Sequence, residues 1–251
     1  MSQSEFNSML AVWIGIAVVT FFVLLRVTAP YGRHTSSRWG PQISNKLGWV
    51  LMEAPVLITL YVIVLSAPGS ISYVTWLIIG LFTVHYLNRI CVYPLRIRTR
   101  GKKMPLMIAA SGVLFNLING FFLGYYFGYF AEYDSDWLAG IPFVAGTLLF
   151  ITGMYLNWRA DNILIHLRKQ GETGYVIPRG WLFEYVSCPN LFGEMIEWLG
   201  FAILCWNVPA LAFAIWTAAN LIPRAISHHK WYQSEFNNYP KQRDAIIPFV
   251  V

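Results

Sequence analysis

GMYLNWRADNILIHLRKQGETGYVIPRGWLFEYVSCPNLFGEMIEW, residues 153–198, places polar and ionisable side chains inside segments that are otherwise as apolar as membrane helices. The polar residues form two sets whose spacing puts the members of each set on one face of a helix. The first set is Asn157 and Asp161, and the second is Asn190, Glu194 and Glu197. A basic, aromatic segment with Gly and Pro separates the sets. The pattern predicts two polar helix faces and a loop that hold a charged ligand at a membrane surface.

The composition of the whole chain is that of an integral membrane protein. Of its 251 residues, 57% are hydrophobic, 17% aromatic and only 12% charged, whereas about 25% are charged in an ordinary soluble domain. We expect a single membrane domain over residues 1–251. The net charge of +6 does not by itself indicate a nucleic-acid partner, because the cations must first be placed relative to a bilayer. We expect no nucleic acid.

Seven apolar stretches are long enough to cross a bilayer as helices, which takes about 20 residues each. They lie near residues 8–28, 47–66, 72–95, 105–130, 141–160, 191–207 and 208–227. The last two are divided by Asn207, Val208 and Pro209, which signal a tight turn. The sequence therefore predicts an all-α bundle of seven transmembrane helices.

The basic residues orient this bundle. With the N-terminus outside, each Lys and Arg falls in a cytosolic segment or towards the cytosolic end of a helix. The acidic residues Glu5, Glu132, Asp134 and Asp136 then fall outside. The positive-inside rule predicts an outer N-terminus, a cytosolic C-terminus and a ligand site that faces the cytosol. We expect the endoplasmic reticulum in a eukaryote, or the inner membrane in a bacterium.

Gly120, Gly124 and Gly128 repeat every four residues within the stretch 105–130. Such spacing lets helices pack closely, either between two copies of a chain or within one bundle. We favour packing within one bundle and expect a monomer.

Glu53 and Tyr86 lie inside two predicted helices at similar depths, roughly 10 and 15 Å from the cytosolic ends at 1.5 Å per residue. These depths are close enough for direct contact. A carboxyl group at this level is expensive unless it faces a polar cavity or a partner, so Glu53 is a candidate functional residue. A purely structural hydrogen bond to a neighbouring helix is the alternative.

Two further polar stripes follow from four-residue spacing. His85 and Arg89 form one, which either pairs with Asp161 or a glutamate of the stretch 191–207 for structure or contacts a ligand. The other comprises Arg224, His228 and Tyr232. Alone it would be an interfacial anchor, but the stripes converge on one leaflet, which favours a ligand site.

The loop RIRTRGKK, residues 96–103, carries five cations in eight residues. Anionic lipid headgroups are the common partners of such a juxtamembrane run. Together with Arg168 and Lys169, however, the loop could neutralise the phosphates of a nucleotide. Since no GxGxxG follows a strand, a nucleotide would be held by helix ends and loops.

We expect no metal site. Adjacent histidines such as His228 and His229 point to different sides of a helix, and Cys91, Cys188 and Cys205 form no CxxC pair.

Several segments together resemble the steroid 5α-reductase family, the 3-oxo-5α-steroid 4-dehydrogenases, over nearly the whole chain. They are PYGRHT from Pro30, LMEAP around Glu53, FTVHYLNR around Tyr86, NGFFLGYY from Asn119, GMYLNWRADNILIHLRK, GETGYVIPRGWLFEYVS, PNLFGEMIEW and the tail HHKWYQSEFNNYPKQRDAIIPFVV. The resemblance implies a seven-helix membrane enzyme that transfers hydride from NADPH to a Δ4-3-oxosteroid.

The resemblance also implies roles for individual residues. Those matching Glu53 and Tyr86 grip the steroid 3-oxo group. The residues that match the NADPH site are Asn157, Asp161, Arg168, Tyr175, Asn190, Glu194, Arg224, His228 and Tyr232. The basic loop is longer than in the mammalian pattern, which leaves the phosphate contact open among Arg98, Arg100 and Lys102.

The resulting hypothesis is hydride transfer to C5 of the enone, with Tyr86 and Glu53 stabilising the enolate on the 3-oxygen. A steroid or steroid-like lipid enters from the membrane, and the nicotinamide lies between the catalytic pair and the stretch 153–198. Three alternatives remain open. They are a reductase of another lipid enone or enoyl substrate, a membrane methyltransferase similar to the isoprenylcysteine carboxyl methyltransferases, and a non-catalytic seven-helix receptor or lipid-binding protein.

Overall fold

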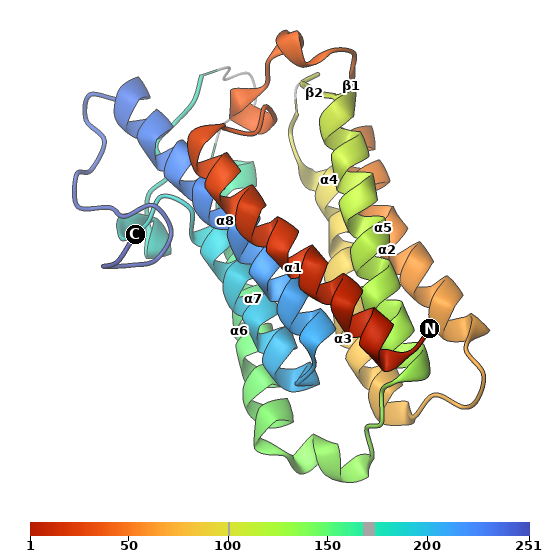
Figure 1. Cartoon of the computed structure of the whole chain (residues 1–251). Coiled ribbons are helices and arrows are strands. Elements are labelled where there is room, and N and C mark those ends of the chain that lie inside the picture. Colours follow the sequence, from red (N-terminus) through yellow and green to blue (C-terminus); the bar gives the residue numbers. More distant parts are fainter. Residues whose placement is uncertain (100, 168–173) are drawn as a thin grey trace. The chain divides into compact units, whose positions relative to one another are not determined.

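The computed structural model describes residues 1–99, 101–167 and 174–251. Helices dominate them (Figure 1). The long helices are α1 (Gln3–Arg26), α2 (Asn45–Ser66), α3 (Tyr73–Leu87), α5 (Leu106–Tyr129), α6 (Ile141–His166), α7 (Pro189–Cys205) and α8 (Val208–Glu235). The shorter elements are η1 (Gly32–His34), η2 (Ser37–Trp39), β1 (Gln42–Ser44), the π-helical turn η3 (Asn88–Val92), α4 (Tyr93–Arg96), β2 (Lys103–Pro105), η4 (Ser135–Ala139) and η5 (Trp181–Glu184).

Local capping explains where several helices begin. Ser2 and Glu5 form a capping box at α1, since the Glu5 N–H donates to Ser2 Oγ at 3.3 Å and the Ser2 N–H donates to Glu5 Oε2 at 2.8 Å. Trp206 ends α7 in the left-handed conformation, with φ of 48°. Asn207 then caps α8 by accepting from the Ala210 N–H at 2.9 Å. The predicted division of the last apolar run is therefore confirmed, but the turn consists of Trp206 and Asn207, and Val208 and Pro209 already belong to α8.

Within the described residues, six helical segments are long and apolar enough to cross a membrane. They are α1, α2, the continuous Tyr73–Arg96, α5, α6 and α8. The predicted stretch 191–207 corresponds to α7, which has 17 residues where a span takes about 20. A helical multi-pass membrane protein is confirmed, while seven spans and their orientation stay predictions.

Two predicted helix ends were too early. The segment expected at 141–160 continues as α6 to His166, so Asp161 lies within the helix. The segment expected at 208–227 continues as α8 to Glu235, so His228 and Tyr232 are also helical. The hydrophobic pattern ended before the helices did, because polar residues at the end of a helix no longer face lipid.

A small sheet was not predicted. β1 pairs antiparallel with β2, in the register Gln42 with Pro105 and Ser44 with Lys103. The Leu106 N–H donates to the Pro41 carbonyl at 2.8 Å and extends this pairing. Three-residue strands show no alternation in a sequence, so only the fold reveals them. The sheet joins the basic loop to the starts of α2 and α5.

The chain divides into two compact units, each described by itself below. Unit 1 comprises Met1–Thr28 and Ala145–Val251, and unit 2 comprises Ala29–Val144. The single-domain organisation stays a prediction.

In unit 2, α5 packs closely on α2 through the predicted glycine stripe. A Cβ at Gly120 would lie 2.7 Å from the Val56 carbonyl oxygen, and one at Gly124 would lie 3.0 Å from Leu60 Cα. Since the glycines face a helix of the same chain, packing within one bundle is confirmed.

In unit 1, α8 lies along both α7 and α1, and Figure 1 shows α7 and α8 as a hairpin. The Trp216 indole N–H donates to the Trp13 carbonyl at 3.1 Å, which fixes α1 against α8.

Candidate functional site

Three polar side chains from three helices of unit 2 meet in one cluster. Tyr86 of α3 donates its hydroxyl to Asn116 Oδ1 of α5 at 3.4 Å. Asn116 Nδ2 donates to the Met52 carbonyl of α2 at 2.6 Å and lies 3.5 Å from Glu53 Oε2. Tyr86 and Asn116 are both buried. Glu53 and Tyr86, predicted at similar depths, thus share a neighbour, Asn116, which was not predicted.

Arg89 supplies a positive charge to this cluster. Its Nη2 lies 3.9 Å from Glu53 Oε1, and the two side chains are only 11% and 13% exposed. The guanidinium also lies over the rings of Trp49, at 4.6 Å, and Tyr93, at 5.0 Å. Glu53, which pairs with Arg89 here, was not among the partners predicted for it. The π-helical turn η3, which carries Arg89, is a feature common at functional sites.

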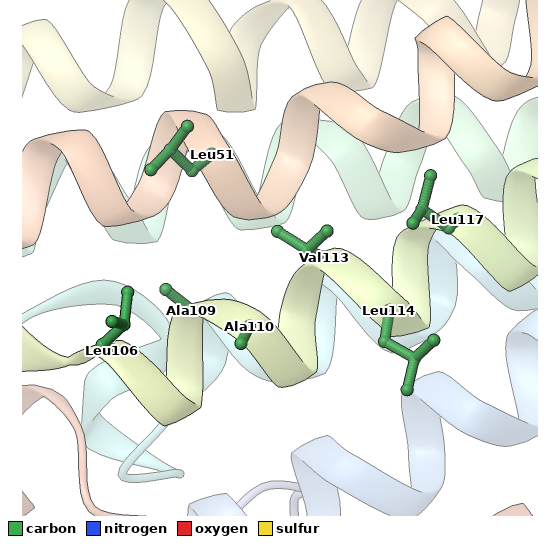
Figure 2. Close-up of a pocket in the computed structure, with 7 residues that line it drawn as sticks. All are labelled: Leu51, Leu106, Ala109, Ala110, Val113, Leu114 and Leu117. Carbon is green, nitrogen blue, oxygen red and sulfur yellow. The ribbon is translucent and has the colours of Figure 1, made fainter. Parts of the chain in front are cut away.

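An apolar groove of about 470 Å³ lies on unit 2 (Figure 2). Figure 2 shows Leu51 on α2, with the other lining residues on α5. The lining consists of Leu51, Leu106, Ala109, Ala110, Val113, Leu114 and Leu117. Since none of these side chains can form a hydrogen bond, the groove suits hydrocarbon but cannot orient a ketone.

The two polar faces of residues 153–198 meet in unit 1, as their spacing predicted. Asn157 Nδ2 on α6 donates to the Asn190 carbonyl at 3.0 Å and lies 3.5 Å from Glu194 Oε2. Asn190 Nδ2 on α7 donates to Asp161 Oδ1 at 3.0 Å. Asn157 Oδ1 is buried and accepts no hydrogen bond from the described residues. A buried amide oxygen without a donor is costly, so this atom is the point where a ligand donor would fit.

Glycines bring these faces together. A Cβ added at Gly153 of α6 would collide with the backbone nitrogen of Glu197, and one added at Gly193 of α7 would collide with that of Asn157. Gly146 and Gly200 make the same close approach seven residues away on each helix. Close glycine packing was predicted only at residues 120–128, so this second glycine contact is new.

The predicted stripe on α8 is present. Arg224 and Tyr232 are buried and His228 is half-buried, all within the helix. Tyr175 packs edge-on against Trp231, with ring centroids 4.7 Å apart, beside this stripe. Tyr232 stacks on Tyr239 of the C-terminal tail at 5.2 Å.

Ser187 joins the segment before α7 to α8 and to the tail. Its Oγ donates to the Asp244 carbonyl at 3.1 Å and lies 2.6 Å from both His229 Nδ1 and the Tyr239 hydroxyl. A hydroxyl has one proton, so His229 and Tyr239 are the donors in these two bonds. Burial raises the pKa of Tyr239, which keeps its phenol protonated as the donor.

A buried arginine fixes the same segment. Arg243 Nη1 donates to the Pro178 carbonyl at 2.8 Å, and its Nη2 lies 3.4 Å from Glu184 Oε2. The Gly180 N–H donates to the other carboxylate oxygen of Glu184. This backbone donor, followed by the charge of Arg243, lowers the pKa of Glu184. The tail, residues 236–251, is therefore bound to residues 178–188.

Two predicted cofactor residues, Arg100 and Arg168, lie outside the described residues. Lys102 is exposed on the turn that precedes β2, where its N–H donates to the Thr99 carbonyl at 3.0 Å. Among the described residues, no group of three or more His, Cys, Asp and Glu side chains could hold a metal ion.

Asn116, Ser187, Tyr239 and Arg243 were missed in the sequence. Asn116 had a usable signal, because an asparagine in the middle of an apolar stretch is expensive in a bilayer. The others follow no periodic pattern, and only the folded tail brings them together.

Comparison with known proteins identifies the family of this chain. A family model described as 3-oxo-5-alpha-steroid 4-dehydrogenase matches residues 102–251. Steroid 5-alpha-reductase DET2 of Gossypium hirsutum is 41% identical over 253 residues, which cover 99% of this chain and 98% of that protein. The 3-oxo-5-alpha-steroid 4-dehydrogenase 1 of Bos taurus is 39% identical over 241 residues, with coverage of 94% and 93%. The human protein of the same name is 41% identical over 222 residues, with coverage of 88% and 85%. The chain belongs to the 3-oxo-5-alpha-steroid 4-dehydrogenases, the steroid 5-alpha-reductase family of oxidoreductases.

Proposed function

We propose that this protein reduces the Δ4 double bond of 3-oxo-Δ4-steroids to 5α-reduced 3-oxosteroids, with NADPH as the hydride donor. The observation that carries the proposal is the buried cluster of Tyr86, Asn116, Glu53 and Arg89. The cluster provides a buried phenol donor, Tyr86, together with a carboxylate, Glu53, whose charge is balanced by Arg89. The names of the relatives supply the substrate class.

Tyr86 acts on the oxygen where charge develops. Addition of hydride at C5 of the enone shifts the double-bond electrons towards the 3-oxygen, which becomes an enolate. The Tyr86 hydroxyl donates to that oxygen, and a positioned donor of this kind contributes roughly 10²- to 10³-fold to kcat. C4 then takes a proton from water, which completes the saturated ketone.

Glu53 and Arg89 set the charge around this donor. A lone carboxylate near a developing oxyanion would oppose it, because like charges at short range are unfavourable. Arg89 offsets the charge of Glu53 at 3.9 Å. The two charges nearly cancel, so the mostly buried pair adds polar groups near Tyr86 without adding a net charge.

The polar faces of unit 1 fit a nucleotide cofactor. The buried Asn157 Oδ1 is open to a ligand donor such as an amide N–H. Arg224 and His228 add basic groups, and Tyr175 and Tyr232 add aromatic rings. When bound, NADPH would supply the hydride. The residues that would hold it are Arg100, Lys102, Asn157, Asp161, Arg168, Tyr175, Asn190, Glu194, Arg224, His228 and Tyr232.

The hairpin of α7 and α8 supports the seventh span. The two helices are joined by a two-residue turn and lie along each other. If α8 crosses the membrane, α7 crosses it in the opposite direction, which makes seven spans and puts the two ends of the chain on opposite sides. The distribution of the basic residues then favours a cytosolic C-terminus and an outer N-terminus. Reporter fusions at the two ends test this topology, because seven spans require opposite sides and six require the same side. The protein acts as a monomer that takes its substrate from the bilayer, in the endoplasmic reticulum or a bacterial inner membrane.

The test is product analysis with testosterone or progesterone and NADPH in detergent or reconstituted vesicles. The wild type should give the 5α-reduced ketone, and Tyr86→Phe should lower kcat roughly 100-fold or more. Tyr61→Phe is the matched control. It removes a tyrosine hydroxyl from the same unit, but that hydroxyl lies 2.9 Å from Thr83 Oγ1 and is not part of the proposed catalytic cluster. Full turnover in both Tyr86→Phe and Glu53→Gln would rule out the mechanism.

Two alternatives have distinct results in the same assay. Reduction of an enoyl thioester or polyprenol without any steroid product would assign another lipid substrate. Methyl transfer from S-adenosylmethionine without oxidation of NADPH would assign a methyltransferase.

A further inference from the structure

We infer that Asn116 is a positioning residue that fixes the direction of the Tyr86 hydroxyl proton, an inference that rests on the proposed function. Asn116 is 4% exposed and is in contact with polar groups from two other helices.

The orientation of the Asn116 amide follows from its neighbours. The Met52 carbonyl only accepts hydrogen bonds, so the amide atom 2.6 Å away must be the NH₂ group. The amide oxygen then faces Tyr86, and it too only accepts. The Tyr86 hydroxyl is therefore the donor, and its proton points at Asn116.

The bond from Tyr86 to Asn116 is long enough to be exchanged for a better one. At 3.4 Å it exceeds the usual O–H···O range of about 2.5–3.0 Å. A developing oxyanion is a stronger acceptor than a neutral amide, so the proton turns to it as charge builds. An amide does not titrate near neutral pH, so Asn116 neither removes the proton nor adds a charge.

The same geometry gives Asn116 a second task. Its NH₂ group lies 3.5 Å from Glu53 Oε2 while its oxygen accepts from Tyr86, so the one amide contacts both the carboxylate and the phenol. Without this amide, the carboxylate is the strongest nearby acceptor for the Tyr86 proton. Asn116 thus keeps the donor available to the substrate while it joins α5 to α2.

Asn116→Leu, which keeps the side-chain volume, tests this inference. We expect kcat to fall about tenfold with the KM for NADPH unchanged, because a single orienting hydrogen bond is lost. In a Tyr86→Phe background the same change should lower kcat less than twofold, since Asn116 acts through the phenol. Asn119→Leu is the control, because Asn119 Nδ2 donates to the Phe115 carbonyl of its own helix at 2.8 Å.

A second readout needs no turnover. In protein labelled with ¹³Cζ-tyrosine, the Tyr86 resonance is identified by its loss in Tyr86→Phe. Asn116→Leu should move this resonance and Asn119→Leu should leave it in place. Where leucine prevents folding, Asn116→Asp has nearly the same size and should also move it, because a carboxylate is a stronger acceptor.

An unmoved Tyr86 resonance, or a kcat loss of equal size with and without the Tyr86 hydroxyl, would overturn the inference. Failure of the wild type to reduce any 4-ene-3-ketone would instead overturn the proposed function, and the resonance would still decide the role of Asn116.

Discussion

Ser187 Oγ accepts a hydrogen bond from His229 Nδ1 at 2.6 Å, a contact between residues 42 positions apart. The contact is consistent with the neutral imidazole, because Gln233 Nε2 donates to the other ring nitrogen, Nε2, at 2.7 Å. Tyr239 donates to the same Ser187 oxygen, and Ser187 donates to Asp244. One hydroxyl thereby connects α8, the C-terminal tail and the segment before α7.

Removal of that hydroxyl should loosen the tail. Ser187→Ala leaves the buried Tyr239 hydroxyl without this acceptor, at about 1–3 kcal/mol, and removes the same acceptor from the half-buried His229. We expect faster proteolysis within residues 236–251 and a several-fold higher KM for NADPH, because Tyr232 stacks on Tyr239. Ser234→Ala is the control, since Ser234 Oγ is exposed and donates only a local bond to the Trp231 carbonyl, at 2.9 Å. Equal proteolysis of the two variants would contradict this account.

The ion pair of Arg89 and Glu53 should be sensitive to loss of one partner. Arg89→Leu leaves a mostly buried carboxylate unbalanced, and breaking a buried pair in this way costs about 3–5 kcal/mol. Thermal unfolding in detergent should show the loss, and Arg89→Leu with Glu53→Gln should recover a large part of it. Additive losses in the double variant would mean that the two charges are not coupled. Arg89→Lys should recover little, because a lysine does not stack on Trp49 and Tyr93 as a planar guanidinium does.

The close approach of α6 and α7 gives a third prediction. Gly153→Ala or Gly193→Ala places a Cβ against a backbone nitrogen, which cannot move without its helix. Overpacking of this kind costs about 1–3 kcal/mol or more and should also separate Asn157 from Asn190. We expect a lower melting temperature and weaker stabilisation by added NADPH. Gly15→Ala in α1 is the control, because a Cβ there has no atom within 4 Å among the described residues, and Ala favours a helix by about 1 kcal/mol.

The helical spacing of polar residues and glycines predicted which side chains share one face of a helix. It gave the polar faces of α6 and α7, the α8 stripe and the packing of Gly120 and Gly124, because these follow from 3.6 residues per turn.

The residues that were not predicted from the sequence are those whose contacts form only in the tertiary structure. The hydrogen bonds of Asn116 with Met52 and Tyr86 form only when α5 lies against α2 and α3, and the ion pair of Arg89 with Glu53 likewise joins two separate helices. Ser187, Tyr239 and Arg243 meet only because the tail folds back on residues 178–188. Catalytic roles for Glu53 and Tyr86 came from resemblance to a family, and their common neighbour supports those roles without testing them.

Low pH should destabilise residues 178–188, which Glu184 links to Arg243. Its carboxylate accepts from the Gly180 N–H and pairs with Arg243, and both lower its pKa from the ordinary value of 4.5. A carboxyl group whose pKa is lower in the folded state stabilises the fold above the unfolded pKa, and the stabilisation is lost as the pH falls through the folded pKa. The side chain is 44% exposed, so solvent screens the effect and it should be modest. We expect the melting temperatures of wild type and Glu184→Gln to differ at pH 7 and to converge below pH 4.5. A difference that stays constant across this range would show that the charge of Glu184 does not hold the segment.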